Sequence, residues 1–382
     1  MNIEELFTKR YLDNFKYSLD VGVEIEMPLV NLEENHIVDS IIVQGLFKEL
    51  ERLKFIPCNY DKNGDVIATK SLSNGDTISL EYSLNTLEFS LDKEKSIFEL
   101  EAKFNKYYNF IQEYLKKYNY SLHDGGINPY YKQINKTCLS QKRYKAIEYI
   151  LTSDVKDKLY GQFCAYCCSI QTHINVNRES LAKVFNLFTY INPIKEELFA
   201  NSYMSEIKLK NSRKYLWQNS NFGPFNVGKN KYYKGFDDIL EDYLDRRLFF
   251  VERDNQYFIL KENLSLKKYF EKDKVVAFDI NGKECFINPL EKDLDNFRSY
   301  KDIEISKYGT LEIRTDCMQK ISDIFKVVAF NVGIYENMDM VMKIIKEKGN
   351  IEKNELIKLS QIGLIKRNLN EEKILYGKEL KM

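Results

Sequence analysis

The sequence lacks an excess of charge of either sign, a long apolar run and a glycine-rich phosphate loop. Lysine plus arginine and aspartate plus glutamate number 57 each, so the overall charge indicates neither nucleic acid nor a membrane surface as partner. No apolar run reaches the roughly 18 residues that a membrane-spanning helix needs. Residues 1–6 have neither a basic nor an apolar segment, so we expect no signal peptide. A G-x-x-x-x-G-K-[ST] motif is absent, which excludes a P-loop nucleotide site.

Histidine and cysteine are also scarce, with three and seven residues among 382. An odd number of cysteines in a chain of this length predicts reduced thiols and a cytoplasmic location. Cys164, Cys167 and Cys168 lie close together, but no second pair of ligands at zinc spacing follows them. No Cys–His or Ser–His–Asp spacing indicates a nucleophile. A redox role for the three cysteines stays open, because spacing alone cannot bring two thiols within bonding distance.

The pattern of apolar residues predicts an α+β fold with an antiparallel sheet. The composition, 44% hydrophobic and 14% aromatic, is that of a globular protein, and no internal repeat or linker divides the chain. We expect one catalytic domain over 1–382, with a helical C-terminal part over 318–382. The predicted helices are 3–18, 37–54, 94–118, 139–152, 179–200, 237–250 and 318–367. The predicted strand regions are 21–28, 55–91, 164–176, 255–300 and 309–314.

The segment Val21–Pro28 predicts a strand with one apolar and one acidic face. Its apolar residues alternate with Glu24 and Glu26, which therefore point the same way, roughly 6.6 to 6.8 Å apart along the strand. Two like charges on one face repel each other unless solvent or a cation lies between them. A solvated edge strand would explain this segment alone, and half of an acidic metal site is the alternative.

A second acidic segment surrounds a predicted hairpin turn at Ser83–Thr86. The turn would place Glu81 directly opposite Glu88, with their β-carbons about 5 Å apart. At an effective dielectric constant near 20, two such charges repel by roughly 3 kcal/mol. A divalent cation between them would reverse the sign, whereas splayed glutamates on an exposed hairpin would need no cation.

Two later strands predict further polar faces. The first presents Ser169, Gln171, His173 and Asn175 on one side. The second presents Thr310, Glu312, Arg314 and Asp316 on one side. An ordinary hydrogen-bonded histidine and a surface Glu–Arg ion pair are the simpler alternatives. Next to the glutamate pairs, a role in binding metal or phosphate becomes the stronger interpretation.

Taken together, these strands predict a site for Mg²⁺ or Mn²⁺. The expected metal ligands are Glu24, Glu26, Glu81, Glu88, His173 and Glu312. Carboxylate oxygens with a single imidazole suit these hard cations better than zinc or an iron–sulfur cluster. Several such ions close together predict a polyanionic substrate, with a nucleoside triphosphate as the simplest candidate.

The order of these motifs resembles the glutamate–cysteine ligase family of the plant and bacterial type, with its related carboxylate–amine ligases. The first and last motifs are Gly22–Glu26, similar to G-x-E-x-E, and Gly309–Arg314, similar to G-T-x-E-x-R. Three further segments lie between them. Ser79–Glu81 with Leu87–Ser90 is similar to a paired S-L-E and x-E-x-S hairpin, and Ser169–Asn175 is similar to a V-Q-V or V-H-V strand. Phe199–Ser202 with Ser212–Trp217 is similar to A-N-S followed by S-R-x-x-x-W. The resemblance covers residues 20–320.

The resemblance implies a glutamine-synthetase-like domain, in which a curved antiparallel sheet forms a funnel and helices pack on its outer side. It implies two or three Mg²⁺ held with ATP by the predicted metal ligands. Gln171, His173, Asn175 and Arg314 would contact the nucleotide or its metal. Arg314 would act on the transferred phosphate, and Arg213 would meet a carboxylate or phosphate of the substrates.

The activity implied is ATP-dependent formation of an amide between the γ-carboxylate of glutamate and an amine, through an acyl phosphate. Cysteine as the amine would give γ-glutamylcysteine, a product of glutathione biosynthesis. The turn between the paired glutamates has no glycine here, and Tyr203–Ser205 replaces the usual Pro and Gly. A ligase for another acid, amine or peptide is therefore the alternative. A ligase-like protein that only binds nucleotide is the third. The oligomeric state is not predicted.

Overall fold

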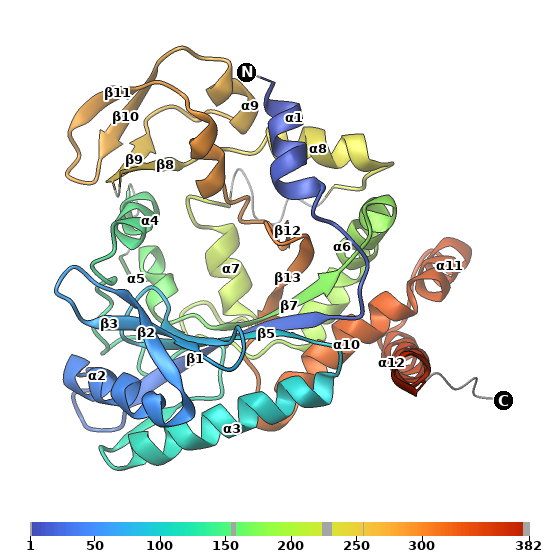
Figure 1. Ribbon diagram of the computed structural model, residues 1–382, viewed down its shortest axis with the longest axis horizontal. Coiled ribbons are helices and arrows are strands. Elements are labelled where there is room, and N and C mark those ends of the chain that lie inside the picture. The colour runs from blue at the N-terminus through green and yellow to red at the C-terminus, as the bar shows by residue number, and fades with distance from the viewer. Residues whose placement is uncertain (1, 154–157, 224–230, 255, 377–382) are drawn as a thin grey trace.

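A nine-stranded antiparallel sheet lies at the centre of the protein (Figure 1). The computed structural model describes residues 2–153, 158–223, 231–254 and 256–376. The strand order is β12-β13-β7-β1-β5-β4-β3-β2, with β6 also paired to β1. The strands are β1 (Val21–Asn31), β2 (Phe55–Tyr60), β3 (Val66–Ser71), β4 (Thr77–Leu80), β5 (Thr86–Glu94), β6 (Tyr120–Leu122), β7 (Ser169–Asn175), β12 (Ile303–Ile305) and β13 (Thr310–Cys317).

The two faces of this sheet differ as the alternation in the sequence predicts. Along β1, Val23, Ile25 and Met27 are buried at 1% exposure or less, while Glu24 and Glu26 alternate with them and stay half-buried. The apolar face is covered by helices α2, α3 and α10, which lie below the sheet in Figure 1. Helix α3 buries residues three and four positions apart, including Leu100, Phe104 and Ile111, as a helix packed by one face does.

Helices account for most of the remaining chain. The α-helices described are α1 (Ile3–Phe7), α2 (Ser40–Glu49), α3 (Ile97–Lys116), α4 (Lys142–Thr152), α5 (Lys158–Gly161), α6 (Leu181–Leu198), α7 (Ser212–Gln218), α8 (Phe236–Leu244), α9 (Leu266–Phe270), α10 (Ile324–Glu336), α11 (Met338–Lys348) and α12 (Lys353–Tyr376). A π-helical turn occupies Thr8–Leu12. The 3₁₀ turns are Leu50–Leu53, Phe163–Ala165, Arg178–Ser180, Glu291–Asn296 and Ile321–Asp323.

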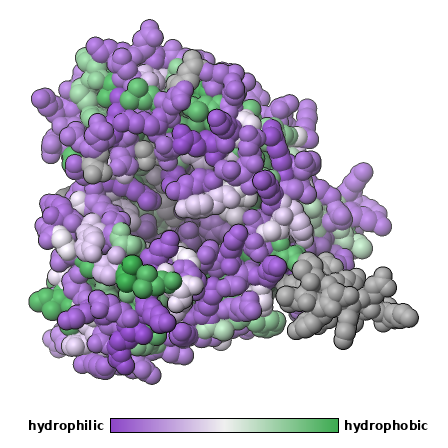
Figure 2. Space-filling model, viewed as in Figure 1, coloured by the Kyte–Doolittle hydropathy of each residue, from purple (hydrophilic) through white to green (hydrophobic). Residues whose placement is uncertain are grey.

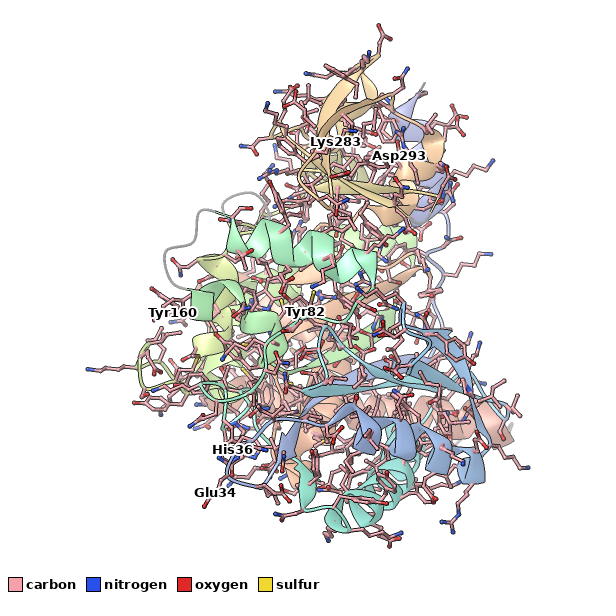
Figure 3. The ribbon with its side chains drawn as sticks, turned by 90° about the vertical axis from the view of Figure 1, so that its left-hand side faces the viewer. Glu34, His36, Tyr82, Tyr160, Lys283 and Asp293 are labelled. Carbon is pink, nitrogen blue, oxygen red and sulfur yellow. The ribbon has the colours of Figure 1, made fainter. Side chains whose placement is uncertain are left out.

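A second antiparallel sheet lies on the polar side of the large one (Figure 1). Its order is β11-β10-β9-β8, and its strands are β8 (Phe250–Arg253), β9 (Gln256–Leu260), β10 (Val275–Asp279) and β11 (Glu284–Ile287). Helix α4 packs against β9. In Figure 3, Tyr82 lies near the middle of the molecule, between Lys283 in the turn from β10 to β11 and His36 toward the opposite end.

The prediction of an α+β fold with a large antiparallel sheet and helices is confirmed, while several boundaries differ. The N-terminal helix predicted to reach residue 18 ends at Leu12. Strand β7 begins at Ser169 rather than 164, because a 3₁₀ turn precedes it. The helix predicted over 237–250 ends at Leu244, and β8 follows. In the C-terminal part, residues 377–382 lie outside the described residues.

The predicted register of the second acidic segment is wrong. Glu88 pairs with Ser79 of β4 and with Glu26 of β1, and Glu81 lies beyond the end of β4. The turn is two residues longer than a tight hairpin: Glu81 N donates to the Thr86 carbonyl at 3.1 Å. Tyr82 inside this turn has φ +61°, a left-handed conformation that costs roughly 1–2 kcal/mol for a residue with a β-carbon.

The prediction that Asp316 shares a face with Glu312 and Arg314 is also wrong. A β-bulge interrupts the pairing of β13 with β7 between Ile313 and Asp316, and the extra residue reverses the direction of the side chains after it. Asp316 therefore points to the helical side, where its Oδ2 accepts from Lys195 Nζ and Asn331 Nδ2, both at 2.9 Å.

The surface seen in Figure 2 is mainly hydrophilic, with small separate groups of hydrophobic residues, and it is hollowed near its centre. Among the helices of the described residues, none is both long and apolar enough to cross a membrane. The seven cysteines form no disulfide, and Cys138, Cys167, Cys168 and Cys317 are buried thiols.

Candidate functional site

A cavity opens on the polar face of the large sheet. Its volume is about 1030 Å³, including the open space of its mouth. The charged and histidine side chains that line it are Glu24, Glu26, Glu81, Glu88, Glu304, Glu312, His173, Arg143, Arg298, Lys307 and Arg314. All six residues predicted from the sequence as metal ligands thus line one cavity, together with Gln171 and Arg314.

Strand register brings the acidic residues next to one another. Glu26 is directly opposite Glu88 on β5, and Glu24 is directly opposite Gln171 on β7. Farther along β7, His173 is directly opposite Glu312 on β13. Directly paired residues of antiparallel strands have their side chains on the same face, about 4.5–5.5 Å apart at the β-carbons. Four adjacent strands therefore supply one continuous polar surface.

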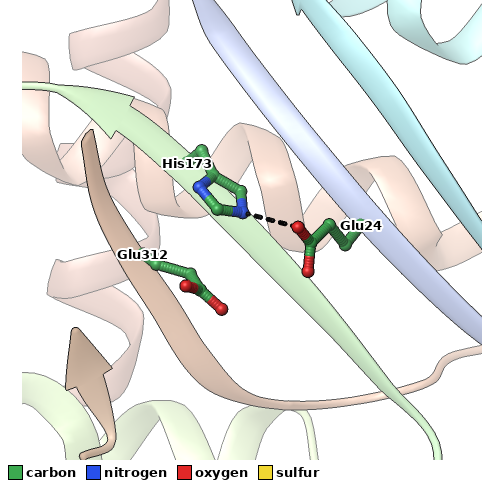
Figure 4. A group of neighbouring side chains, drawn as sticks. All are labelled: Glu24, His173 and Glu312. Atoms are coloured by element: carbon green, nitrogen blue, oxygen red, sulfur yellow. Dashed lines mark ion pairs between the residues drawn. The ribbon is translucent and has the colours of Figure 1, made fainter. Parts of the chain in front are cut away.

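Glu24, His173 and Glu312 form the tightest group (Figure 4). One ligand atom from each lies within 4.8 Å of the others. His173 Nε2 lies 3.4 Å from Glu24 Oε1, is buried and makes no hydrogen bond to any described residue. Nδ1 of the same ring lies 3.1 Å from Thr310 Oγ1. If Nδ1 donates its proton to that hydroxyl, the Nε2 lone pair faces the two carboxylates, as in a metal-ligating histidine.

Glu26 and Gln171 extend this group. Ser169 Oγ and Gln171 Nε2 donate to the two oxygens of Glu26, at 2.7 and 3.0 Å. Gln171 is 2% exposed, and its Oε1 has no hydrogen-bond donor among the described residues. Buried acceptors without a donor are rare in proteins. An unsatisfied amide oxygen, an unsatisfied imidazole nitrogen and several carboxylates are a donor set that fits a hard divalent cation.

The pKa values reflect a cavity with more negative charge than it can stabilise alone. Burial, with the charge of Glu81, raises the pKa of Glu26 to about 7 despite the opposing charge of Arg213. Burial and the charge of Glu24 raise the pKa of Glu88 well above its usual range. Burial also works against ionisation of Glu24, but contact with His173 outweighs it and lowers the pKa of that carboxyl. A bound cation would relieve the repulsion that these shifts report.

These shifts predict how stability depends on pH. Between about pH 4.5 and pH 7, unfolded Glu26 has lost its proton and folded Glu26 retains it, so the free energy of unfolding decreases as pH rises through this range. His173, whose pKa is raised by contact with Glu24 despite burial, contributes in the same direction. We expect the urea midpoint of the protein in EDTA to fall from about pH 5 to about pH 8. Glu26→Gln should flatten that fall, and a midpoint that rises instead would contradict these assignments.

Three cations on the rim of the cavity have no carboxylate partner in the described part of the chain. The Arg298 side chain donates only to the Phe297 carbonyl, and the Arg143 and Lys307 side chains lie over the rings of neighbouring tyrosines. The charges of Glu24 and Glu81 act on Arg143 without forming an ion pair. By contrast, Arg314 forms an ion pair with Glu312. Cations without an ion pair and carboxylates in the same cavity together complement a ligand that carries both negative charge and bound metal ions.

Two predicted site residues lie elsewhere. Arg213, on α7, lines an adjoining cavity, and its Nη1 donates to the Arg314 carbonyl at 3.1 Å. Asn175 does not line the acidic cavity. Its Nδ2 donates to the Asp20 carbonyl at 2.8 Å, which connects β7 to the residue before β1. Asn175 therefore has a structural contact, and the prediction that it binds a cofactor has no support from its position.

Sequence reasoning missed Arg143, Arg298 and Glu304. Glu304, 7% exposed and directly opposite Glu312, lies between Ile303 and Ile305. This is the same apolar–acidic–apolar pattern that identified Glu24, so it was detectable. Arg143 follows Gln141 and Lys142 at the start of a helix, where a basic residue in the sequence looks like any solvated one.

No family model matches the chain, and a search of curated proteins finds no significant relative.

Proposed function

We propose that this protein is an ATP-dependent carboxylate–amine ligase of the glutamate–cysteine ligase type, with glutamate and cysteine as default substrates and a role in γ-glutamyl peptide synthesis. The observation that carries the proposal is the acidic cavity. Five predicted glutamates and His173 converge there, and Arg143, Arg298 and Lys307 lie unpaired on its rim. A metal–polyphosphate complex matches both halves of that charge pattern.

The proposed fold is the glutamine-synthetase-like one, with the polar sheet face as the inner wall of a funnel. Glu24, Glu26, Glu81, Glu88, His173 and Glu312 would hold two or three Mg²⁺, or Mn²⁺. When bound, these ions neutralise phosphate charge and orient the terminal phosphoryl group. A cytoplasmic location is part of the proposal, because the free thiols persist in a reducing compartment.

The reaction has two steps in this proposal. A carboxylate oxygen of the acid substrate attacks the γ-phosphorus of ATP, the bond to the bridging oxygen breaks, and ADP leaves with that electron pair. The amine nitrogen then attacks the acyl carbon, a C–N bond forms, and inorganic phosphate leaves as the C–O bond breaks. The proton lost by the amine passes to solvent or to a carboxylate of the cavity.

The residues of the chain supply position and charge for these steps. Arg314 lies on the cavity wall, where the Glu312 carboxylate fixes its guanidinium. It would contact the transferred phosphoryl group, as a preorganised donor. Arg143 and Arg298 would hold the remaining phosphates and, in doing so, exclude water from them. A ligase for a different acid, amine or peptide is the second candidate, because nothing in the acidic cavity selects cysteine.

Phosphate release tests the proposal. With ATP and Mg²⁺, release should require a carboxylate substrate and increase when an amine is added. Glu26→Gln should abolish it, because the variant keeps the size of the side chain and removes its charge. If phosphate release depends on glutamate but does not change when cysteine is added, an acyl phosphate is still formed and the amine substrate is a compound other than cysteine. If no acid in a broad panel supports release, the ligase proposal is wrong and nucleotide binding alone is left.

A further inference from the structure

A second cavity adjoins the acidic one. Its volume is about 630 Å³, including the space of its mouth. The two cavities share Glu26, Glu81, Arg143 and Arg314 in their walls, so they are neighbours at these residues. A ligand in the second cavity would have one end beside the groups to which the phosphate chemistry is assigned.

The walls away from those shared residues are aromatic. Phe163 packs edge-on against Trp217 with ring centroids 4.9 Å apart, and Trp217 stacks on Tyr300 at 6.2 Å. The cavity is also lined by Tyr82, Tyr144, Ile147, Cys164 and Cys167. Small-molecule sites have this composition: apolar and aromatic walls with a few polar groups that fix orientation. Aromatic faces contribute most of their energy by covering apolar surface, so the ligand has an apolar part.

Arg213 supplies a charged anchor at the edge of this cavity. The residue is 7% exposed, and the one hydrogen bond that its side chain makes within the described residues goes to the Arg314 carbonyl. No carboxylate of the described chain lies within ion-pair distance of it. Of the other cations near it, Lys214 pairs with Glu196 and Arg314 pairs with Glu312. Arg143 also lines this cavity and has no ion pair among the described residues. The charge of Glu26 reaches Arg213 only from beyond ion-pair distance. A buried guanidinium without a direct carboxylate contact is costly, and a planar carboxylate is the anion it binds best.

The geometry points to this cavity as the acceptor subsite, for an α-amino acid whose carboxylate pairs with Arg213 and whose apolar side chain packs against Trp217 and Tyr300. This inference rests on the proposed ligase function and changes its default acceptor. Leucine, methionine and phenylalanine offer more apolar surface to the aromatic wall than cysteine does. The amino group would face the shared residues, where the acyl phosphate forms.

Trp217 allows binding to be measured without turnover, because it is the only tryptophan in the chain. Its fluorescence is titrated with glycine, cysteine, leucine, methionine and phenylalanine, alone and with Mg²⁺ plus a non-hydrolysable ATP analogue. We expect a saturable change with the three larger amino acids, at least about tenfold tighter than with glycine or cysteine, since each buried methylene adds roughly 0.8 kcal/mol. Equal affinity for glycine and leucine, or no saturable change in either condition, would overturn the inference.

Two comparisons test the carboxylate contact. Arg213→Gln should weaken leucine binding at least tenfold, while Arg52→Gln, on an exposed side chain paired with Glu49 outside both cavities, should leave it unchanged. Isoamylamine, which is leucine without its carboxylate, should bind the unchanged protein at least tenfold more weakly than leucine, so the contact is tested even if Arg213→Gln does not fold. Equal binding of leucine and isoamylamine would refute the contact. Leucine binding without phosphate release would refute the ligase activity and support the amino-acid subsite. Phosphate release with cysteine but no binding of leucine would support the ligase activity and refute the apolar subsite.

Discussion

Replacing Glu24 with glutamine is expected to lower kcat/KM for ATP-dependent phosphate release on the order of 10³-fold. Glu24 belongs to the tightest group of ligand atoms, with His173 and Glu312. The substitution preserves the shape of the side chain and removes the charge that a divalent cation needs.

The same variant should lose its stabilisation by Mg²⁺. A ligand at 100 times its dissociation constant stabilises the folded state by about 2.7 kcal/mol, so Mg²⁺ should raise the melting temperature of the unchanged protein and have little effect on Glu24→Gln. Glu284→Gln is the matched control, since Glu284 is half-exposed in the small sheet and pairs only with Lys261. Full turnover and a full Mg²⁺ response in Glu24→Gln would show that this group holds no metal.

Removing Asp316 is expected to destabilise the fold by about 3–5 kcal/mol. Its ion pair with Lys195 has an Nζ–Oδ2 distance of 2.9 Å, and the two side chains are 0% and 1% exposed. Asp316→Ala would leave the Lys195 ammonium buried without its counter-charge. The remaining hydrogen bond goes to the neutral amide of Asn331, which cannot replace a carboxylate. Urea unfolding measures the loss, as a lower midpoint at constant slope.

Two further variants separate the loss of charge balance from the loss of packing. Lys195→Met combined with Asp316→Leu removes both charges and should recover most of the stability that Asp316→Ala loses, since apolar residues often replace a buried pair without cost. Lys261→Met breaks a half-exposed pair and should cost less than about 1 kcal/mol. A cost below about 1 kcal/mol for Asp316→Ala would mean that water reaches Lys195.

The faces of the strands were predictable, because alternation in the sequence fixes which residues point the same way. This is how Glu24, Glu26, Glu88, His173 and Glu312 were assigned to one surface, and the structure brings them together. The order of neighbouring strands was not predictable from alternation. Glu88 pairs with Glu26, 62 positions away, because the two strands bury their apolar faces against the same helix.

Local irregularity explains the two errors of register. Glu81 was placed in a hairpin because its neighbours alternate, but the turn is longer and Tyr82 adopts a left-handed conformation that favours glycine. Counting in steps of two predicts Asp316 on the same face as Glu312 and Arg314, and the bulge in β13 breaks that count. A bulge adds one residue to a strand, and no residue type in this segment marks where it occurs, so alternation alone does not predict it.

Strand order also determines when this cavity can form during protein synthesis. Strand β1 pairs with β7, and β7 with β13, so the three strands that carry Glu24, His173 and Glu312 emerge from the ribosome far apart in time. At about 5–20 residues per second, the interval between β1 and β7 alone is roughly 7–30 s. Throughout it, one edge of β1 is open to pairing with another nascent chain. Fragments that end before β13 would leave the edge of β7 exposed in the same way, and ribosome pausing or truncation in this region is a natural origin of aggregates.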